Sequence, residues 1–278
     1  MFQIPSKIFE SLYKQLLISL CLVFISPAFT SATTTPLTFG LFPYTTQNNL
    51  IAHNKFLSDY LQKKLGQSIS IQVAENMPVF VHNMEDGQYD FILAPPHVAR
   101  YSELKLHFQR IAMTTHMIRG VYVVHKDSHF KDLNSLRNKT IIMASPLALL
   151  SQGSIQQLRN IGLIDKETVT IKTTSSHKNA IFSVLHKEAD AAITGIKLWN
   201  DYPERHKKYL KVLAYGDSLP GMMIMGSKRL SNAEIEKMRR FLVEFNASHA
   251  GKDYIFQGFK TIDNQSMQQL DAYTNVLK

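Results

Sequence analysis

The sequence predicts an α/β protein in which two three-layer lobes, joined by two crossing strands, enclose a cleft. Strand-like and helix-like segments alternate along most of the chain, which is typical of largely parallel sheets covered by helices. This alternation begins afresh after Gly120, and few strands follow Met225, so the end of the chain is expected to return to the first lobe. The 278 residues also exceed the length of a usual single domain.

Residues 1–32 have the pattern of a cleavable export signal. Lysines precede an apolar run over residues 16–24, and small residues follow it. The run is shorter than the about 20 residues that a comfortable membrane span needs. We expect signal peptidase to cut after Ala32, with Ala28 as the second choice. An uncleaved membrane anchor over residues 18–29 is the alternative.

The composition excludes several classes of function. The single cysteine, Cys21, lies in the signal, so the mature protein would have no thiol for catalysis, metal binding or redox chemistry. The chain carries 31 Lys and Arg against 22 Asp and Glu, a net charge of +9, which favours anionic ligands only as a bias. No basic run is interleaved with stacking aromatic residues, so we expect no nucleic-acid binding.

The first lobe is predicted to consist of residues 33–118 and 221–278. Periodicity, caps and glycine stops place strands at 37–42, 69–73, 89–93, 110–115 and 222–225. The same signals place helices at 50–65, from the cap Asn76 to Gly87, from the capping box of Ser231 and Glu234 to Phe245, and at 265–276.

The second lobe is predicted to consist of residues 119–220. Its strands are expected at 120–125, 140–144, 169–173, 191–194 and 212–215. Its helices are expected at 146–161, 178–187 and 197–209. With this division the chain crosses between the lobes twice, which gives a hinge and a cleft.

Four loops lie where ligands of open α/β sheets bind. Such ligands sit beyond the carboxyl ends of strands, where helix amino termini present unpaired N–H groups and a partial positive charge. The loops are 43–48, 94–97, 145–151 and 174–179. The candidate ligand-binding residues on them are Tyr44, Pro96, His97, Ser145, Leu147, Ala148, Ser176 and His177.

Two of these loops are predicted to open helices. Ser145 and Pro146 have the order of a helix start, which would direct the N–H groups of Leu147 and Ala148 into the cleft. Ser145 could instead act purely as a cap. In the other loop Ser176 would cap a helix beside His177, and a helix amino terminus disfavours imidazolium, so a neutral imidazole is expected. A packing role for that histidine is the alternative.

The other two loops offer a ring and a stiff corner. Tyr44 can line a pocket with its ring while its hydroxyl donates a hydrogen bond, although a plain surface turn would also explain it. Pro95 and Pro96 make a rigid corner that can present His97 to a ligand. A rigid connection with no contact to ligand is the alternative.

Catalytic, metal and cofactor sites are not expected. The sequence contains no G-x-S-x-G turn, H-E-x-x-H helix, P-loop or G-x-G-x-x-G after a strand. His125 and His129 are four residues apart, but no third ligand accompanies them. The pattern therefore favours binding without chemistry, and an enzyme is the least favoured function.

The segments together resemble the phosphate/phosphite/phosphonate-binding family of ABC-transporter solute-binding proteins. The stretches that carry the resemblance are FLSDYLQKKLG, YDFILAPPHVARY, RGVYVVHKDS with LNSLRNKTI, and SSHKNAIFSVLHKEADAA. The last is the most specific, because in the family a histidine opens that helix and an acidic residue precedes the next strand, as His177 and Asp190 do here. The resemblance implies the type II periplasmic-binding-protein fold.

One segment departs from the family pattern. Relatives cradle an oxyanion on a helix start rich in Ser and Thr, whereas residues 145–151 read Ser-Pro-Leu-Ala-Leu-Leu-Ser. The proline matches and most of the hydroxyls do not. We therefore expect weak or absent binding of simple phosphonates, and an apolar part on the ligand if the leucines face the cleft instead of the core.

The resemblance implies a monomeric periplasmic protein that captures a small anionic or zwitterionic solute and delivers it to a membrane permease. A module of the same fold that senses ligand and signals to a membrane partner is the alternative. Both hypotheses need the same cleft and no cofactor.

Overall fold

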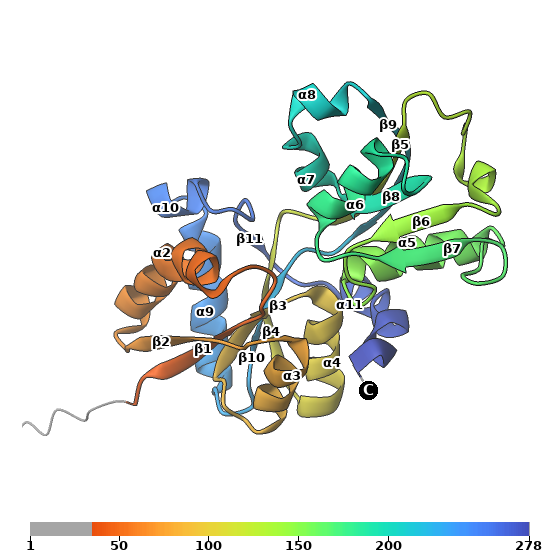
Figure 1. The fold of residues 1–278 in the computed structure, drawn as a ribbon. Helices are drawn as coiled ribbons and strands as arrows, with labels where there is room; N and C mark the ends of the chain where they lie inside the picture. Colours follow the sequence, from red (N-terminus) through yellow and green to blue (C-terminus); the bar gives the residue numbers. More distant parts are fainter. Residues whose placement is uncertain (1–34, 278) are drawn as a thin grey trace, which may run out of the picture. The chain divides into compact units, whose positions relative to one another are not determined.

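The structure, a computed structural model, describes residues 35–277. The predicted export signal therefore lies outside the described residues. Two mixed sheets with helices on their faces make up the described part (Figure 1), which confirms the predicted α/β class. In residues 35–277, no helix is both long and apolar enough to cross a membrane.

Sheet A has six strands in the order β11-β4-β10-β3-β1-β2. Its strands are β1 (Leu37–Leu41), β2 (Ile69–Val73), β3 (Phe91–Ala94), β4 (Gln109–Thr114), β10 (Met223–Gly226) and β11 (Phe259–Lys260). The first three strands are parallel, whereas β10 runs antiparallel to both β3 and β4. A strand from late in the chain therefore lies between two early ones.

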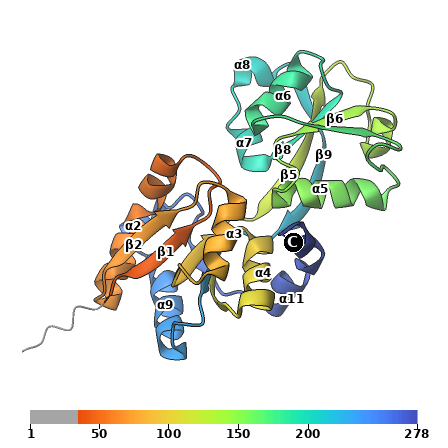
Figure 2. The ribbon, with the colours of Figure 1, turned by 60° about the horizontal axis from the view of Figure 1, so that its bottom comes forward.

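Helices cover both faces of sheet A. They are α2 (Gln47–Leu65), α3 (Met77–Glu85), α4 (Pro96–Leu106), α9 (Asn232–Phe245), α10 (His249–Lys252), α11 (Asn264–Gln268) and the 3-10 helix η2 (Asp271–Leu277). Apolar residues of α2 and α9 pack on one face, and those of α3, α4 and α11 pack on the other (Figure 2). This arrangement buries the alternate faces of the strands in two separate clusters.

Sheet B has five strands in the order β7-β6-β8-β5-β9. They are β5 (Ile118–His125), β6 (Thr140–Met143), β7 (Thr170–Thr173), β8 (Ala191–Gly195) and β9 (Leu210–Leu219). Its helices are η1 (Leu133–Leu136), α5 (Leu149–Asn160), α6 (His177–Leu185), α7 (Ile196–Asn200) and α8 (Glu204–Lys207). Residues of α6 and α7 pack on one face, and residues of α5 pack on the other.

The two segments that connect the sheets lie side by side. The amide of Thr114, at the end of β4, donates to the carbonyl of Met222, which precedes β10, at 2.8 Å. A side chain at Gly221 would place its Cβ 2.3 Å from both the Thr114 hydroxyl and the His116 carbonyl. Only glycine permits this close approach of the two connecting segments.

Several predicted elements differ from those observed. Helix α4 was not expected, since the segment after Pro95 reads as a corner; the proline at its first position fits a helix start. It ends at His107 with a φ of 58°, a left-handed position where glycine is the usual signal. The helix expected over 197–209 is divided into α7 and α8, because Pro203 stands at the cap of α8 and disfavours helical backbone before it.

Candidate functional site

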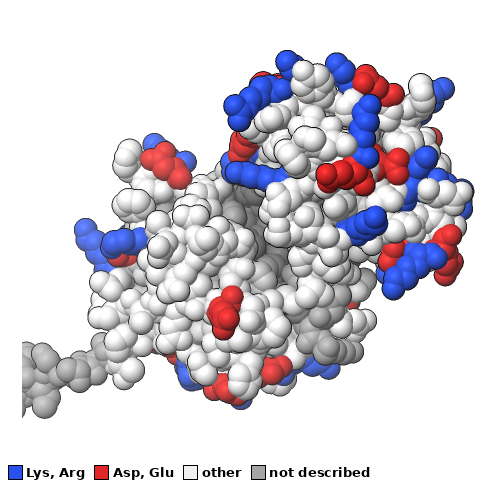
Figure 3. Space-filling model, viewed as in Figure 1, with Lys and Arg blue, Asp and Glu red and all other residues white. Residues whose placement is uncertain are grey.

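A cavity of about 610 Å³ lies between the ends of the two sheets. Its lining comes from both sheets and from the segments that connect them. The lining residues are 42–44, Met77, Pro95, His97, 116–119, 144–145, 147–150, 175–177, 195–197, Met222 and Phe256. In the space-filling view the hollow between the two halves is bordered mainly by uncharged atoms, whereas charged side chains gather over the half that holds sheet B (Figure 3).

Most of the predicted binding residues line this cavity, but Pro96 does not. Pro96 is buried as the first residue of α4, where it carries His97 on the next position. Sequence reasoning missed the contribution of 116–119, Met222 and Phe256. The first two belong to the connecting segments, so the predicted crossings were the signal that could have located them.

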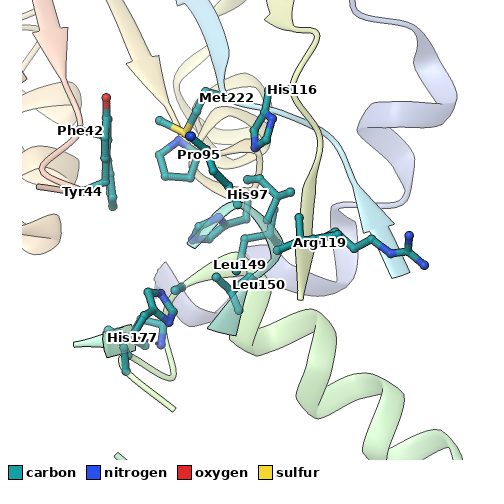
Figure 4. A pocket seen from close by; sticks show the side chains of 18 of the residues that line it. Phe42, Tyr44, Pro95, His97, His116, Arg119, Leu149, Leu150, His177 and Met222 are labelled. Carbon is teal, nitrogen blue, oxygen red and sulfur yellow. Dashed lines mark hydrogen bonds between the residues drawn. The ribbon is translucent and has the colours of Figure 1, made fainter. Parts of the chain in front are cut away.

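His97 is a buried imidazole without a partner. It is 1% exposed, and neither ring nitrogen has a hydrogen-bond partner among the described residues. Burial lowers its pKa to about 4, so the ring is neutral at pH 7. Figure 4 shows this ring below Pro95 and above the ring of His177, with Tyr44 farther to the left.

His177 stands at the start of α6 as predicted. The hydroxyl of the cap, Ser176, accepts from the amide of Asn179 at 3.1 Å. The Nδ1 atom of His177 is buried and has no partner in the described part of the chain. Burial lowers the pKa of His177, and a hydrogen bond of the ring to the Ile193 backbone opposes this shift only in part. Desolvation therefore favours the neutral form, as was expected from the helix end.

The loop between β6 and α5 differs from the predicted helix start. Helix α5 begins at Leu149, and the residue in the cap position is Ala148. The Leu147 amide donates to the Ser145 hydroxyl at 3.2 Å, and the Ala148 amide donates to the Ser145 carbonyl at 3.3 Å. The two amides that were expected to point into the cleft are therefore both engaged by Ser145. The amides of Leu149 and Leu150 are the ones left without an acceptor among residues 35–277.

The leucines of this loop face in two directions. Leu147 is 41% exposed and lines the cavity. Leu149 is 3% exposed and packs in the cluster that contains Val98 and Met223. The alternatives of cleft and core are thus both realised, by neighbouring residues.

Tyr44 presents its ring to the cavity. Figure 4 shows its hydroxyl directed away from His97, and the hydroxyl pairs with the side chain of Asn54, while burial raises its pKa to about 12. The same Asn54 accepts from the Tyr254 hydroxyl at 2.9 Å. The Tyr44 ring also meets the Phe256 ring edge to face, with centroids 5.8 Å apart. The cavity therefore receives an aromatic face at this position and no hydroxyl donor.

The charged residues that line the cavity are both engaged elsewhere. The Arg119 guanidinium donates to the Gly216 carbonyl at 2.9 Å and lies over the Tyr215 ring, and Figure 4 shows it pointing away from the histidines. The Lys197 ammonium pairs with Asp201 at 3.0 Å. Among the described lining residues there is no aspartate or glutamate.

Among curated protein sequences, no relative matches the chain. Over residues 39–267 the chain matches the family model described as the periplasmic substrate-binding protein of phosphonate ABC transporters. This match covers well over half of the chain and confirms the resemblance found in the sequence.

Solved structures of low sequence identity share the fold. The protein XAC2383 from Xanthomonas citri, bound to ATP, has 17% identity and a TM-score of 0.72, over 88% of this chain and 98% of that one. PhnD1 from Prochlorococcus marinus, in complex with methylphosphonate, has 14% identity and a TM-score of 0.71, over 87% and 97%. A binding protein component of an ABC phosphonate transporter from Pseudomonas aeruginosa has 18% identity and a TM-score of 0.66, over 86% and 87%. The fold is the two-lobed type II periplasmic binding fold, and the chain belongs to the family of phosphonate-type periplasmic substrate-binding proteins of ABC transporters.

Proposed function

We propose that the protein captures a small anionic solute in the cavity between its two sheets and delivers it, chemically unchanged, to a membrane permease. The observation that supports this most is the chemistry of the lining: neutral imidazoles of His97 and His177 and the start of α5 meet in one cavity without a carboxylate among the described lining residues. The neutral N–H donor of His97 and the positive helix ends complement an anion.

The proposed site residues are those that the sequence predicted. Tyr44, His97, Leu147 and His177 would contact the solute directly. Ser145, Ala148 and Ser176 would shape the two loops, since Ser145 closes a turn and Ser176 caps α6. Pro96 would fix the position of His97.

We further propose that the lobes are discontinuous in sequence, with residues 33–118 and 221–278 in one and residues 119–220 in the other. The place of β10 inside sheet A supports this division. A solute that touches both lobes would favour the shut form over the open one, and closure would follow from this difference in affinity. The protein is proposed to act as a monomer. A protein of the same fold that senses a ligand would use the same cavity. No contact among the described residues favours this sensing function over delivery to a permease.

A thermal-shift screen tests the proposed binding. The exported protein is screened against phosphate, phosphite, alkyl- and aminoalkylphosphonates, sulfonates, amino acids and thiamine-like cations. An anion present at 100 times its dissociation constant should add about 2.7 kcal/mol to the free energy of unfolding, which raises the melting temperature by roughly 5 °C or more.

Two variants locate the effect. His177→Ala should abolish the shift, whereas His82→Ala, on the exposed face of α3, should keep it. Stabilisation by the cations alone, or an equal effect of the two variants, would contradict binding of an anion in this cavity.

A further inference from the structure

We propose that the solute is an organic anion with an apolar, ring-containing body and no ammonium group. This inference rests on the proposed function and names the class of ligand for the same cavity. It differs from a small phosphonate and from a zwitterion, and it follows from three features of the lining.

The first feature is the absence of a counter-charge for a cation. None of the described lining residues is an aspartate or a glutamate, and the charged ones are Arg119 and Lys197. The helix amino termini contribute partial positive charge, and no carboxylate among these described residues offsets it. An ammonium group buried there would lose its water without gaining a carboxylate among the described lining residues, which is unfavourable. A zwitterionic solute is therefore disfavoured against an anion of the same size.

The second feature is a receptor for one anionic group. His97 is fully buried, lines the cavity and leaves both ring nitrogens without a partner in the described structure. As a neutral imidazole it carries one N–H donor, whereas the His177 ring at the start of α6 hydrogen-bonds the Ile193 backbone and leaves its Nδ1 as an acceptor unpaired among the described residues. The amides of Leu149 and Leu150 open the 12-residue helix α5 beside them. An anionic group placed among these donors would satisfy groups that are otherwise buried and unpaired.

The third feature is the apolar wall that faces these donors. The Tyr44 ring turns its face to the cavity because Asn54 engages its hydroxyl. Phe42, Met77, Met117, Met222 and Phe256 continue the wall. A flat ring is the body that best covers an aromatic face, by offset or edge-to-face stacking.

The volume of the cavity agrees with such a body. Pockets of about 300–1,000 Å³ are typical for drug-sized ligands, and this cavity measures about 610 Å³. A one-carbon phosphonate would fill a small part of it and would leave the apolar wall in contact with water. The ring and the anionic group together account for both the wall and the unpaired donors.

Calorimetric titration of the exported protein tests the inference. The probes are matched pairs: benzylphosphonate against methylphosphonate, phenylacetate against acetate, phenylmethanesulfonate against methanesulfonate, and propylphosphonate against 2-aminoethylphosphonate. For at least one anionic group the ring should tighten binding by about tenfold or more. The amino group should weaken binding by about tenfold or more relative to propyl.

A substitution then tests whether the ring of the ligand packs against the ring of Tyr44. Tyr44→Ala should lose the gain from the ring and leave the methyl compounds within about threefold, while Tyr209→Ala, exposed outside the cavity, should change neither. A melting curve of each variant shows that it is folded.

The outcomes separate the inference from the proposed function. The inference would be overturned, and solute capture left intact, if methylphosphonate bound more tightly than benzylphosphonate or if 2-aminoethylphosphonate bound more tightly than propylphosphonate. An unchanged gain from the ring in Tyr44→Ala would also overturn it. Failure of every anion, in these pairs and in the screen, would overturn both.

Discussion

The protonation of His97 is controlled by its burial. Its imidazole has no hydrogen-bond partner in the described chain, so nothing compensates the cost of a charge there. In the folded protein the pKa of His97 is about 4, compared with the ordinary histidine value of 6.5. The unfolded chain therefore takes up a proton between these pH values that the folded protein does not.

The stability of the protein should accordingly depend on pH through His97. Above pH 6.5 His97 is neutral in both states, and its contribution to the free energy of unfolding is complete. This contribution is lost as the pH falls from 6.5 to about 4, and it changes no further below pH 4, where His97 is protonated in both states. The full loss is roughly 3 kcal/mol of unfolding free energy. In urea unfolding across this range, the free energy of unfolding of His97→Met should fall less steeply with falling pH than that of the wild type, by a slope equivalent to about one proton. Parallel curves for His97→Met and wild type would contradict the burial argument.

Asn54 positions the aromatic wall from a second element. This buried side chain of α2 donates to the Leu50 carbonyl at 2.9 Å and accepts from Tyr254 at 2.9 Å. Asn54→Leu should lower the free energy of unfolding by about 1–3 kcal/mol, because the Tyr254 hydroxyl is left buried and unpaired. Adding Tyr254→Phe to this variant should cost little more, since it removes the stranded hydroxyl. Additive losses in denaturant unfolding would show that the two side chains are not coupled.

At this scale the sequence identifies positions better than orientations. Tyr44, His97 and His177 follow strands or open helices, and that placement is enough to predict that they line a cavity. The direction of the Tyr44 hydroxyl could not be predicted, because it depends on Asn54, which lies ten positions along the chain on a helix whose facing is set by packing. Whether His97 has a hydrogen-bond partner among the described residues likewise depends on which side chains surround it in the folded protein.

At the scale of elements, the loop from β6 to α5 and the start of α5 carry one leucine that packs in the core and one that faces the cavity. Leu149 is buried in a core cluster, and Leu147 is largely exposed to the cavity. Leu149→Ala should therefore cost about 2–5 kcal/mol of stability, whereas Leu147→Ala should change it by about 0.5 kcal/mol or less. Urea unfolding of the two variants provides the comparison, and equal losses would contradict the assignment of the two faces.

Elements with strong local signals are predictable from sequence. The capping box is one: Ser231 and Glu234 satisfy each other's backbone amides at the start of α9. Asn76 likewise accepts from the Val79 amide at 3.0 Å at the start of α3. The end of α4 gives no such signal, because a histidine and not a glycine takes the left-handed position at His107. The start of α5 gives a misleading one, because Ser145 closes a turn before the helix begins.

At the scale of the whole molecule, the pattern of alternating elements predicts two sheets and two crossings between them, but not the contacts between the crossing segments. The hydrogen bond between Thr114 and Met222 brings the two connecting segments together, and residues between them form part of the cavity. No local property of His116 and Met117, or of the first two residues of β5, distinguishes them from an ordinary strand connection. Their role follows from the topology, which places them between the sheets.

Export should remove the amino-terminal signal. Its charged start, apolar core and small-residue exit predict cleavage after Ala32. Mass spectrometry of the protein from the periplasmic fraction should find an amino terminus close to Thr33. Recovery of chains that begin with Met1 from that fraction would contradict cleavage and favour the membrane anchor.

The central claim is that one solute occupies the cavity and touches both sheets. A crystal structure of the exported protein with the tightest-binding anion of the screen tests it most directly. The anionic group should lie within hydrogen-bond distance of His97 or His177, and the rest of the solute should contact the Tyr44 ring. A solute bound outside this cavity, or held by residues of one sheet alone, would contradict the claim.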